Sequence, residues 1–198
     1  MNYIKIDNIS KSYSIKIFSD LHFTFEQKKP CAVTGPNGSG KSTLINILSL
    51  KFLPDAGVIK YVHAGTEINE KRSSSVTGIV SPYFNPYEEM NMRQTAQFVS
   101  FGNAGKLKSI CDNYRIFHIN ENEKFGNLSE GFKQRAKICL AFTDDVQFLL
   151  LDEPFNSLDE EGRLILENFI EKKSDCVIVT ASNDKNETGF CSEELNLG

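Results

Sequence analysis

The feature that most constrains this chain is a glycine-rich segment, residues 35–43, which matches the pattern G-x-x-x-x-G-K-[ST]. A short apolar run, residues 31–34, precedes it, and residues 41–50 carry apolar side chains at helical spacing. A buried strand that turns through glycines into a helix is typical of a loop that wraps around phosphate groups. The segment therefore predicts a nucleotide-binding α/β fold.

The same pattern predicts a role for each part of the loop. Glycines let the backbone approach phosphates closely, and the loop N–H groups and the positive end of the following helix attract negative charge. We expect Lys41 to reach the β- and γ-phosphates of ATP and the Ser42 hydroxyl to bind Mg²⁺. The predicted ATP-binding residues of this loop are Gly35, Pro36, Asn37, Gly38, Ser39, Gly40, Lys41, Ser42 and Thr43.

A second apolar run ends in two acidic residues. Residues 146–151 have the length and apolar character of a parallel strand that is covered on both faces. Such a strand would deliver Asp152 to the carboxyl edge of the sheet, where ligands collect in open α/β folds. We expect Asp152 to hold Mg²⁺ through water and Glu153, the predicted catalytic residue, to polarise an attacking water molecule.

The rest of the pattern predicts how the elements are arranged. Two early segments alternate apolar and polar residues, as half-buried antiparallel strands do, whereas later apolar runs alternate with helices, as in a parallel α/β sheet. The expected strands are residues 4–9, 21–25, 31–34, 58–62, 78–80, 146–151 and 176–180, and the expected helical regions are 41–50, 87–142 and 158–170. Residues 63–76 are polar and are expected to form a loop.

A third motif distinguishes this chain from other proteins with such a loop. Residues 128–132 read LSEGF, precede a helical stretch and resemble the LSGGQ signature of ATP-binding-cassette (ABC) ATPases. The order of glycine-rich loop, signature and acidic strand end is that family's order, and residues 156–159 resemble its D-loop. Tyr13 lies where the family has an aromatic residue that stacks on adenine. The resemblance covers essentially the whole chain.

The resemblance implies an α/β fold: a P-loop NTPase core with a mostly parallel sheet, an N-terminal antiparallel β subdomain and a helical signature subdomain. We expect one domain over residues 1–198, with residues 1–80 and 143–198 forming the RecA-like core and β subdomain. Residues 87–142 would form the helical subdomain, interrupted at Gly102, Gly105 and Gly126.

The resemblance also implies partners. Ser129 and the Gly131 N–H would bind the γ-phosphate of ATP held by a second subunit, so that two copies face each other head-to-tail as a homodimer. A separate integral membrane permease would dock against the helical subdomain and residues 82–87, where Tyr83, Phe84 and Tyr87 could grip it. The chain would then power transport by hydrolysing ATP.

Three departures from the family pattern bear on the rate of hydrolysis. Glu130 and Phe132 replace a glycine and a glutamine of the signature, and no glutamine follows the strand that ends near residue 80. Ser182 stands at or near the place of a histidine that senses the γ-phosphate. A lost charge-assisted hydrogen bond of roughly 1.5–3 kcal/mol would slow turnover about ten- to a hundredfold. Since Glu153 is present, we expect slowed hydrolysis.

Composition limits the partners and the cellular location that we expect for this chain. The net charge of −4 argues against nucleic acid as a partner. The 5 cysteines include no C-x-x-C pair and are expected to be reduced thiols. No targeting signal and no membrane-spanning run are recognised, so we expect a cytoplasmic protein held at the membrane by its permease.

Two other functions fit the same motifs. A degenerate cassette could bind ATP as a structural or regulatory switch, which the altered positions near Ser81 and Ser182 would favour. A non-transport ABC ATPase could act on ribosomes or DNA, although the negative charge, the single cassette and the absence of sustained heptads speak against it.

Overall fold

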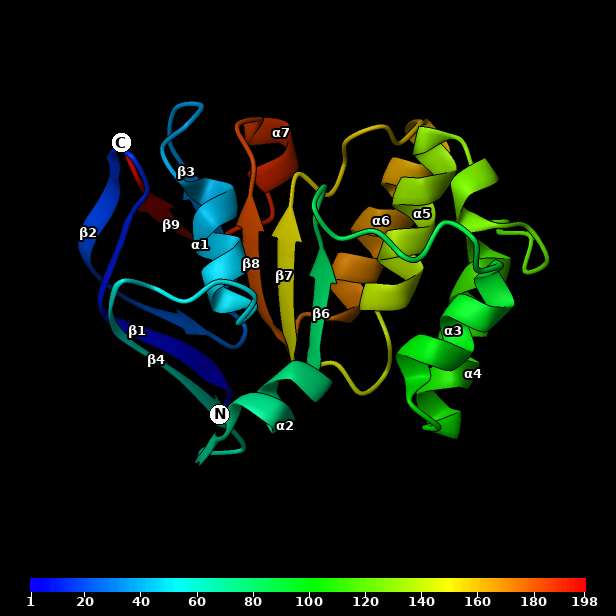
Figure 1. The fold of residues 1–198 in the computed structure, drawn as a ribbon, viewed down its shortest axis with the longest axis horizontal. Coiled ribbons are helices and arrows are strands. Elements are labelled where there is room, and N and C mark those ends of the chain that lie inside the picture. Colours follow the sequence, from blue (N-terminus) through cyan, green and yellow to red (C-terminus); the bar gives the residue numbers. More distant parts are fainter.

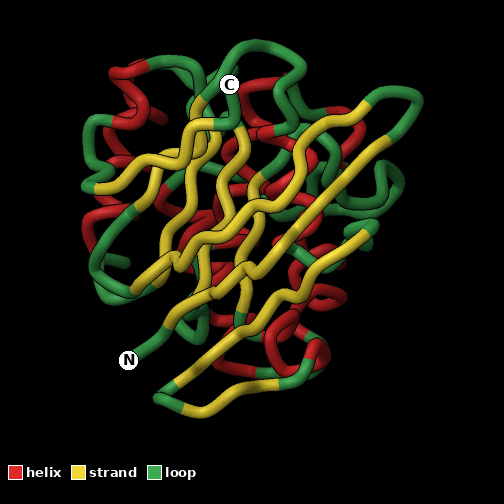
Figure 2. The backbone as a smooth tube through the Cα atoms, turned by 90° about the vertical axis from the view of Figure 1, so that its left-hand side faces the viewer, coloured by secondary structure: helices red, strands yellow, loops and turns green.

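The computed structural model describes residues 1–198, apart from the side chain of Lys185. Its strands form an antiparallel sheet in the order β2-β1-β4-β5 and a parallel sheet in the order β6-β7-β8-β3-β9. Figure 2 shows the long antiparallel strands in front of the parallel sheet. The strands are β1 (Tyr3–Ser12), β2 (Lys16–Glu26), β3 (Cys31–Thr34), β4 (Ala56–His63), β5 (Thr66–Ile68), β6 (Thr77–Val80), β7 (Phe148–Asp152), β8 (Val177–Ala181) and β9 (Glu193–Asn196).

Helices connect and cover these strands (Figure 1). The helices are α1 (Lys41–Leu48), α2 (Glu70–Ser75), α3 (Met92–Ser100), α4 (Ala104–Ile116), the 3₁₀ turn η1 (Phe125–Asn127), α5 (Glu130–Ala141), α6 (Glu160–Lys172) and α7 (Lys185–Thr188). This arrangement confirms the expected α/β fold with an antiparallel β part, a parallel core sheet and a helical region.

Strand β7 divides the interior into two hydrophobic clusters. Successive side chains of a strand point to opposite faces of its sheet. Phe148 and Leu150 accordingly pack with α1 and the antiparallel sheet, whereas Leu149 and Leu151 pack with residues of α3, α4, α5 and α6. Helices α1 and α5 therefore lie on opposite faces of the parallel sheet, and Figure 1 shows α1 beside β3 and α5 beyond β6.

The helical region shares its hydrophobic cluster with the sheet. Met92 of α3, Tyr114 of α4 and Ala136 of α5 belong to the same buried cluster as the strand residue Leu149. The helices between β6 and β7 are thus anchored on one face of the parallel sheet.

Residues 63–76 do not form the expected loop, and that expectation was wrong. Ala64 and Gly65, with φ of 51° and 80°, make a tight turn that pairs β5 with β4. The side chain of Asn69 then caps α2 by accepting a hydrogen bond from the Arg72 N–H at 2.9 Å. The local signal for these elements was a turn residue followed closely by a helix-capping asparagine. Polar composition alone missed it, because it does not distinguish a short capped helix from a loop.

Two further expectations need correction. Gly105 lies inside α4 and does not interrupt the helical region, whereas Phe101 and Gly102, with φ of 47° and 79°, end α3. Strand β9, at residues 193–196, was not predicted from the sequence. It is an edge strand paired parallel to β3, and Leu195 is its single apolar residue, so it lacks the apolar run that marks the inner strands.

Within the described chain, no helix combines the length and the apolar character that crossing a lipid bilayer requires.

Candidate functional site

The glycine-rich loop joins β3 to α1 at the carboxyl edge of the parallel sheet. Gly35, Gly38 and Gly40 all have positive φ values, of 139°, 87° and 100°. At Gly40 a side chain is also excluded by contact, because a Cβ atom there would lie 2.3 Å from Ile17 Cγ2 of β2. The backbone of the loop therefore depends on glycine, as a close-fitting phosphate loop requires.

Lys41 is buried at the start of α1, with 8% of its surface exposed. Its ammonium group donates hydrogen bonds to the carbonyl oxygens of Gly35 at 2.8 Å and Pro36 at 3.2 Å. These bonds hold the positive charge beneath the loop. Asn37, at the outer end of the loop, accepts a hydrogen bond from Asn183 Nδ2 at 2.6 Å, which connects the loop to the segment after β8.

Ser42 and Asp152 come together although they lie far apart in the sequence. The Ser42 hydroxyl donates to Asp152 Oδ1 across 3.0 Å, and Asp152 is 1% exposed at the end of β7. Asp152 Oδ2 is buried and has no donor within hydrogen-bond distance, although the Ser81 hydroxyl lies near the carboxyl group. A hydroxyl and a carboxylate at this spacing fit Mg²⁺, which prefers oxygen ligands and is commonly held by one or two carboxylates together with substrate phosphates.

The charge of Asp152 is constrained by its surroundings. Burial raises the pKa of this carboxyl group, while the Ser42 hydrogen bond, the positive charge of Lys41 and the Ser81 hydroxyl lower it. Burial is the strongest of these effects, so the ionised side chain is held at a free-energy cost that a bound cation would offset.

Glu153 follows directly and has a left-handed backbone, with φ of 49°. Its N–H donates to the Ala181 carbonyl at 2.9 Å, which ties this conformation to β8. Burial raises the pKa of the Glu153 carboxyl group, and the nearby charges of Glu187 and Asp152 raise it further. A raised pKa suits a group that accepts a proton near neutral pH.

Ser182 lies where the resemblance led us to expect a histidine, and the structure places it against Glu153. Its hydroxyl is 3.4 Å from Glu153 Oε2 and 2.7 Å from Glu187 Oε2. Glu187 was not singled out from the sequence. Nothing in its local pattern marks it, because its proximity to Glu153 arises from the pairing of β8 with β7 together with the turn from β8 into α7.

The signature segment begins α5. Ser129 is its N-cap, and the Ser129 hydroxyl accepts from the Phe132 N–H at 3.4 Å. Gly131 lies so close to the D-loop that a Cβ atom there would be 2.9 Å from the Ser157 carbonyl oxygen. Glu130 forms an ion pair with Lys133 at 2.9 Å, which compensates its negative charge beside the helix start. Helices α5 and α1 occupy opposite faces of the sheet, and the contacts of Ser129 and Gly131 among the described residues are with Phe132 and Ser157 and not with the phosphate loop.

Tyr13 lies in the hairpin between β1 and β2, with 56% of its surface exposed. The same hairpin approaches the phosphate loop, because Ile17 and Phe18 of β2 lie against Gly40. The Lys11 ammonium is 5.5 Å from the centre of the Tyr13 ring. An exposed ring on an element that touches the loop is available for stacking on a base.

The chain is similar to known proteins in sequence and in fold. A sequence profile of the family described as ABC transporter matches residues 18–156. The chain is 31% identical over 193 residues to the lacticin-481/lactococcin-DR transport/processing ATP-binding protein of Lactococcus lactis subsp. lactis, covering 90% of this chain and 27% of that protein. It is 29% identical over 173 residues to the Nod factor export ATP-binding protein I of Rhizobium etli, covering 84% of this chain and 55% of that protein. The chain thus spans about a quarter and about half of these two relatives.

A solved structure described as the dimeric structure of a bacterial ABC transporter cassette has the same fold. Its TM-score is 0.83 at 20% identity, covering 98% of this chain and 95% of that one. The family profile extends over most of the chain and includes the glycine-rich loop, the signature and Asp152. The chain therefore belongs to the ABC transporter family, as an ATP-binding cassette.

Proposed function

We propose that this chain binds ATP with Mg²⁺ and hydrolyses it to power an ABC transporter through a separate membrane permease. The observation that carries the proposal is the 3.0 Å hydrogen bond between Ser42 and Asp152, with Glu153 next in the chain. It brings the phosphate loop, a Mg²⁺ ligand pair and a general base to one sheet edge.

Each group has a defined task in this mechanism. The loop N–H groups and Lys41 bind the β- and γ-phosphates, and Tyr13 stacks on the adenine. Ser42 and Asp152 would hold Mg²⁺, which supplies positive charge to the phosphate oxygens when it is bound. Glu153 orients a water molecule and accepts its proton on a carboxylate oxygen as that water attacks the γ-phosphate.

A second copy of the chain would complete the site. A helix start with a serine cap and free N–H groups binds anions, yet Ser129 lies on the face of the sheet opposite α1. A head-to-tail homodimer brings Ser129 and Gly131 of one subunit to the ATP of the other. In this arrangement residues 1–198 act as one domain, with residues 87–142 as the helical subdomain that carries the signature.

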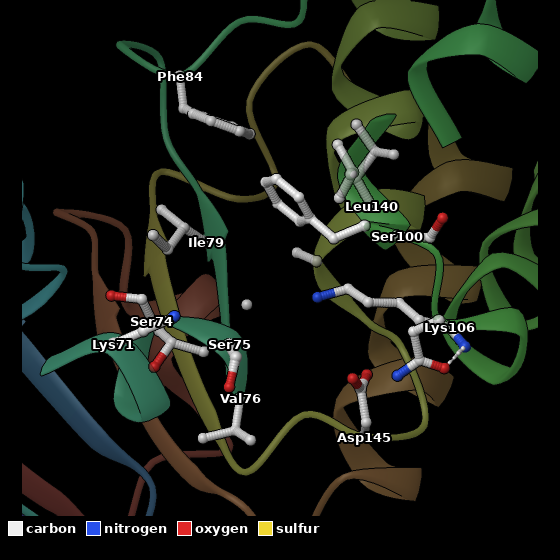
Figure 3. Close-up of a pocket in the computed structure, with 16 residues that line it drawn as sticks. Lys71, Ser74, Ser75, Val76, Ile79, Phe84, Ser100, Lys106, Leu140 and Asp145 are labelled. Carbon is white, nitrogen blue, oxygen red and sulfur yellow. Dashed lines mark hydrogen bonds between the residues drawn. The ribbon is translucent and has the colours of Figure 1, made fainter. Parts of the chain in front are cut away.

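The permease would dock in a cavity of about 970 Å³. Helix α2 and strand β6 form one side of this cavity, and the helical region forms the other. Figure 3 shows Ile79 and Phe84 on one side of this cavity and Leu140 and Lys106 on the other. Phe101 lines the cavity and begins a row of exposed aromatic rings. The Phe98 ring lies 5.9 Å from that of Phe101 and 5.8 Å from that of Tyr87, centre to centre. An apolar groove with an aromatic rim suits a short helix of a partner protein.

The hydrolysis proposal is tested with Glu153→Gln. The amide keeps the size of the side chain and cannot accept the proton, so phosphate release should fall at least a hundredfold while ATP affinity is retained. The matched control is Glu167→Gln on the exposed side of α6, which should hydrolyse ATP like the wild type. Wild-type protein that binds ATP without steady-state phosphate release would instead favour the switch function.

The docking proposal is tested by cell fractionation in the organism that encodes the chain. Phe101→Ser should shift tagged protein from washed membranes to the soluble fraction without changing its ATP affinity. The control is Leu164→Ser, which replaces another exposed apolar side chain, on α6. Equal membrane fractions for both variants and the wild type would rule out docking at this rim.

A further inference from the structure

Glu187 is a buried carboxylate that the mechanism above leaves without a role. Only 4% of its surface is exposed, although it lies in the short helix α7 near the molecular surface. Acidic side chains are rarely buried unless they are paired. Glu187 has two partners: Oε2 faces the Ser182 hydroxyl at 2.7 Å, and Oε1 accepts from the Arg163 guanidinium at 3.3 Å.

Arg163 fixes Glu187 relative to the catalytic segment. Its guanidinium carbon lies 5.7 Å from the centre of the Phe155 ring, and Phe155 is buried two residues after Glu153. The segment that carries Glu187 also contacts the phosphate loop, since Asn183 donates to Asn37 at 2.6 Å. Glu187 is thus held near the catalytic segment through Arg163 and near the phosphate loop through the segment that contains Asn183.

The Ser182 hydroxyl has one proton and two carboxylates beside it. The Asp184 N–H donates to Ser182 Oγ at 3.1 Å, which occupies one acceptor position of the oxygen. The hydroxyl proton can go to Glu187 across 2.7 Å or to Glu153 across 3.4 Å. The shorter contact has ideal O–H···O⁻ length, whereas the longer one is at the limit of a hydrogen bond, so the proton points to Glu187.

We propose that Glu187 is a positioning residue for ATP hydrolysis, which accepts the hydrogen bond of the Ser182 hydroxyl and so keeps Glu153 Oε2 available to accept a proton from water. Without an acceptor at residue 187, the Ser182 hydroxyl turns to its remaining neighbour and donates to Glu153 Oε2. That oxygen is then occupied by a hydrogen bond and is less accessible to the attacking water. The role rests on the proposed function of Glu153 as general base.

The first test measures the turnover number at saturating Mg-ATP and the dissociation constant for ATP in purified chains. Glu187→Met keeps the volume of the side chain and removes the acceptor, so turnover should fall about ten- to a hundredfold with little change in ATP affinity. Glu187→Gln keeps a carbonyl oxygen for Ser182 and should stay within a few-fold of the wild type. The control Glu167→Met changes an exposed residue of α6.

The decisive variant is the double substitution. Ser182→Ala removes the hydroxyl that Glu187 restrains, so adding it to Glu187→Met should restore turnover toward the value of Ser182→Ala alone. A residue that only stabilises the fold would give a double variant slower than either single one.

Three results would overturn the proposal: wild-type turnover in Glu187→Met, no recovery in the double variant, or loss of folding in both Glu187 variants. Failure of the proposed function is seen separately. In that case the wild type releases no phosphate, or Glu153→Gln retains wild-type turnover.

Discussion

The substitution Asp152→Asn tests the candidate Mg²⁺ site, because it replaces one carboxylate oxygen by an amide nitrogen. The side chain is 1% exposed, Oδ1 accepts the Ser42 hydroxyl at 3.0 Å, and Oδ2 has no hydrogen-bond partner. Asn at this position can keep an oxygen toward Ser42 while it loses the charge. The Asn amide nitrogen replaces Oδ2, so a neutral polar group remains there and only the charge is removed. Because an unpartnered buried charge costs more than a neutral polar group, which costs about 1–3 kcal/mol, Asp152→Asn should stabilise the nucleotide-free protein by about 1–2 kcal/mol.

The stabilisation should depend on pH. The pKa of Asp152 is raised in the folded state, mainly by burial. Below the ordinary aspartate pKa, Asp152 therefore causes no loss of stability in the folded protein. The free energy of unfolding then decreases as the pH rises from that value through the raised pKa of Asp152. The difference between Asp152→Asn and the wild type should be smallest near the ordinary aspartate pKa and largest at neutral pH. For a domain of this size about 1–2 kcal/mol corresponds to roughly 2–8 °C in Tm.

Mg-ATP should reverse the order of the two proteins. Binding at a hundred times Kd stabilises a folded protein by about 2.7 kcal/mol, and Asp152→Asn has lost a Mg²⁺ ligand. The assay is urea and thermal unfolding followed by circular dichroism, with and without Mg-ATP. The control is Asp112→Asn on α4, where ion pairs with Lys108 at 2.6 Å and Arg115 at 2.7 Å lower the pKa, so neutralisation should not stabilise. The reasoning is refuted if Asp152→Asn is less stable than the wild type without nucleotide, or if its effect is independent of pH.

Three further outcomes are expected. Lys41→Ala should weaken ATP binding about ten- to a hundredfold in titration calorimetry, because a buried charge-assisted phosphate contact is lost; an unchanged Kd would contradict this role. Phe148→Ala should cost about 3–5 kcal/mol in urea unfolding because this ring is fully buried between sheet and helix, whereas the half-exposed Phe98→Ala should cost far less; equal losses would refute the assigned core. Gly131→Ala should lower turnover several-fold with unchanged ATP affinity, because its Cβ would lie 2.9 Å from the Ser157 carbonyl and displace the signature; normal turnover would show that the contact can relax.

Local motifs predicted several of the elements that form the candidate site. The phosphate loop, the strand that ends at Asp152 and the helix that starts at Ser129 were predicted because their backbone geometry is encoded by neighbouring residues: glycines for the loop, an apolar run for β7, a serine cap for α5. Strand β9 and helix α2 were missed, because an edge strand and a short capped helix need no long apolar pattern.

What the sequence alone determined, then, is which chemical groups the chain possesses and the local backbone that presents each of them. Only the tertiary structure decided which groups meet. The hydrogen bond from Ser42 to Asp152 depends on α1 packing against β7, and the placement of Glu187 near Glu153 depends on β8 pairing with β7. The opposite placement of α1 and α5 likewise follows from the two faces of one sheet. Such contacts join segments far apart in the chain, and no local spacing specifies them.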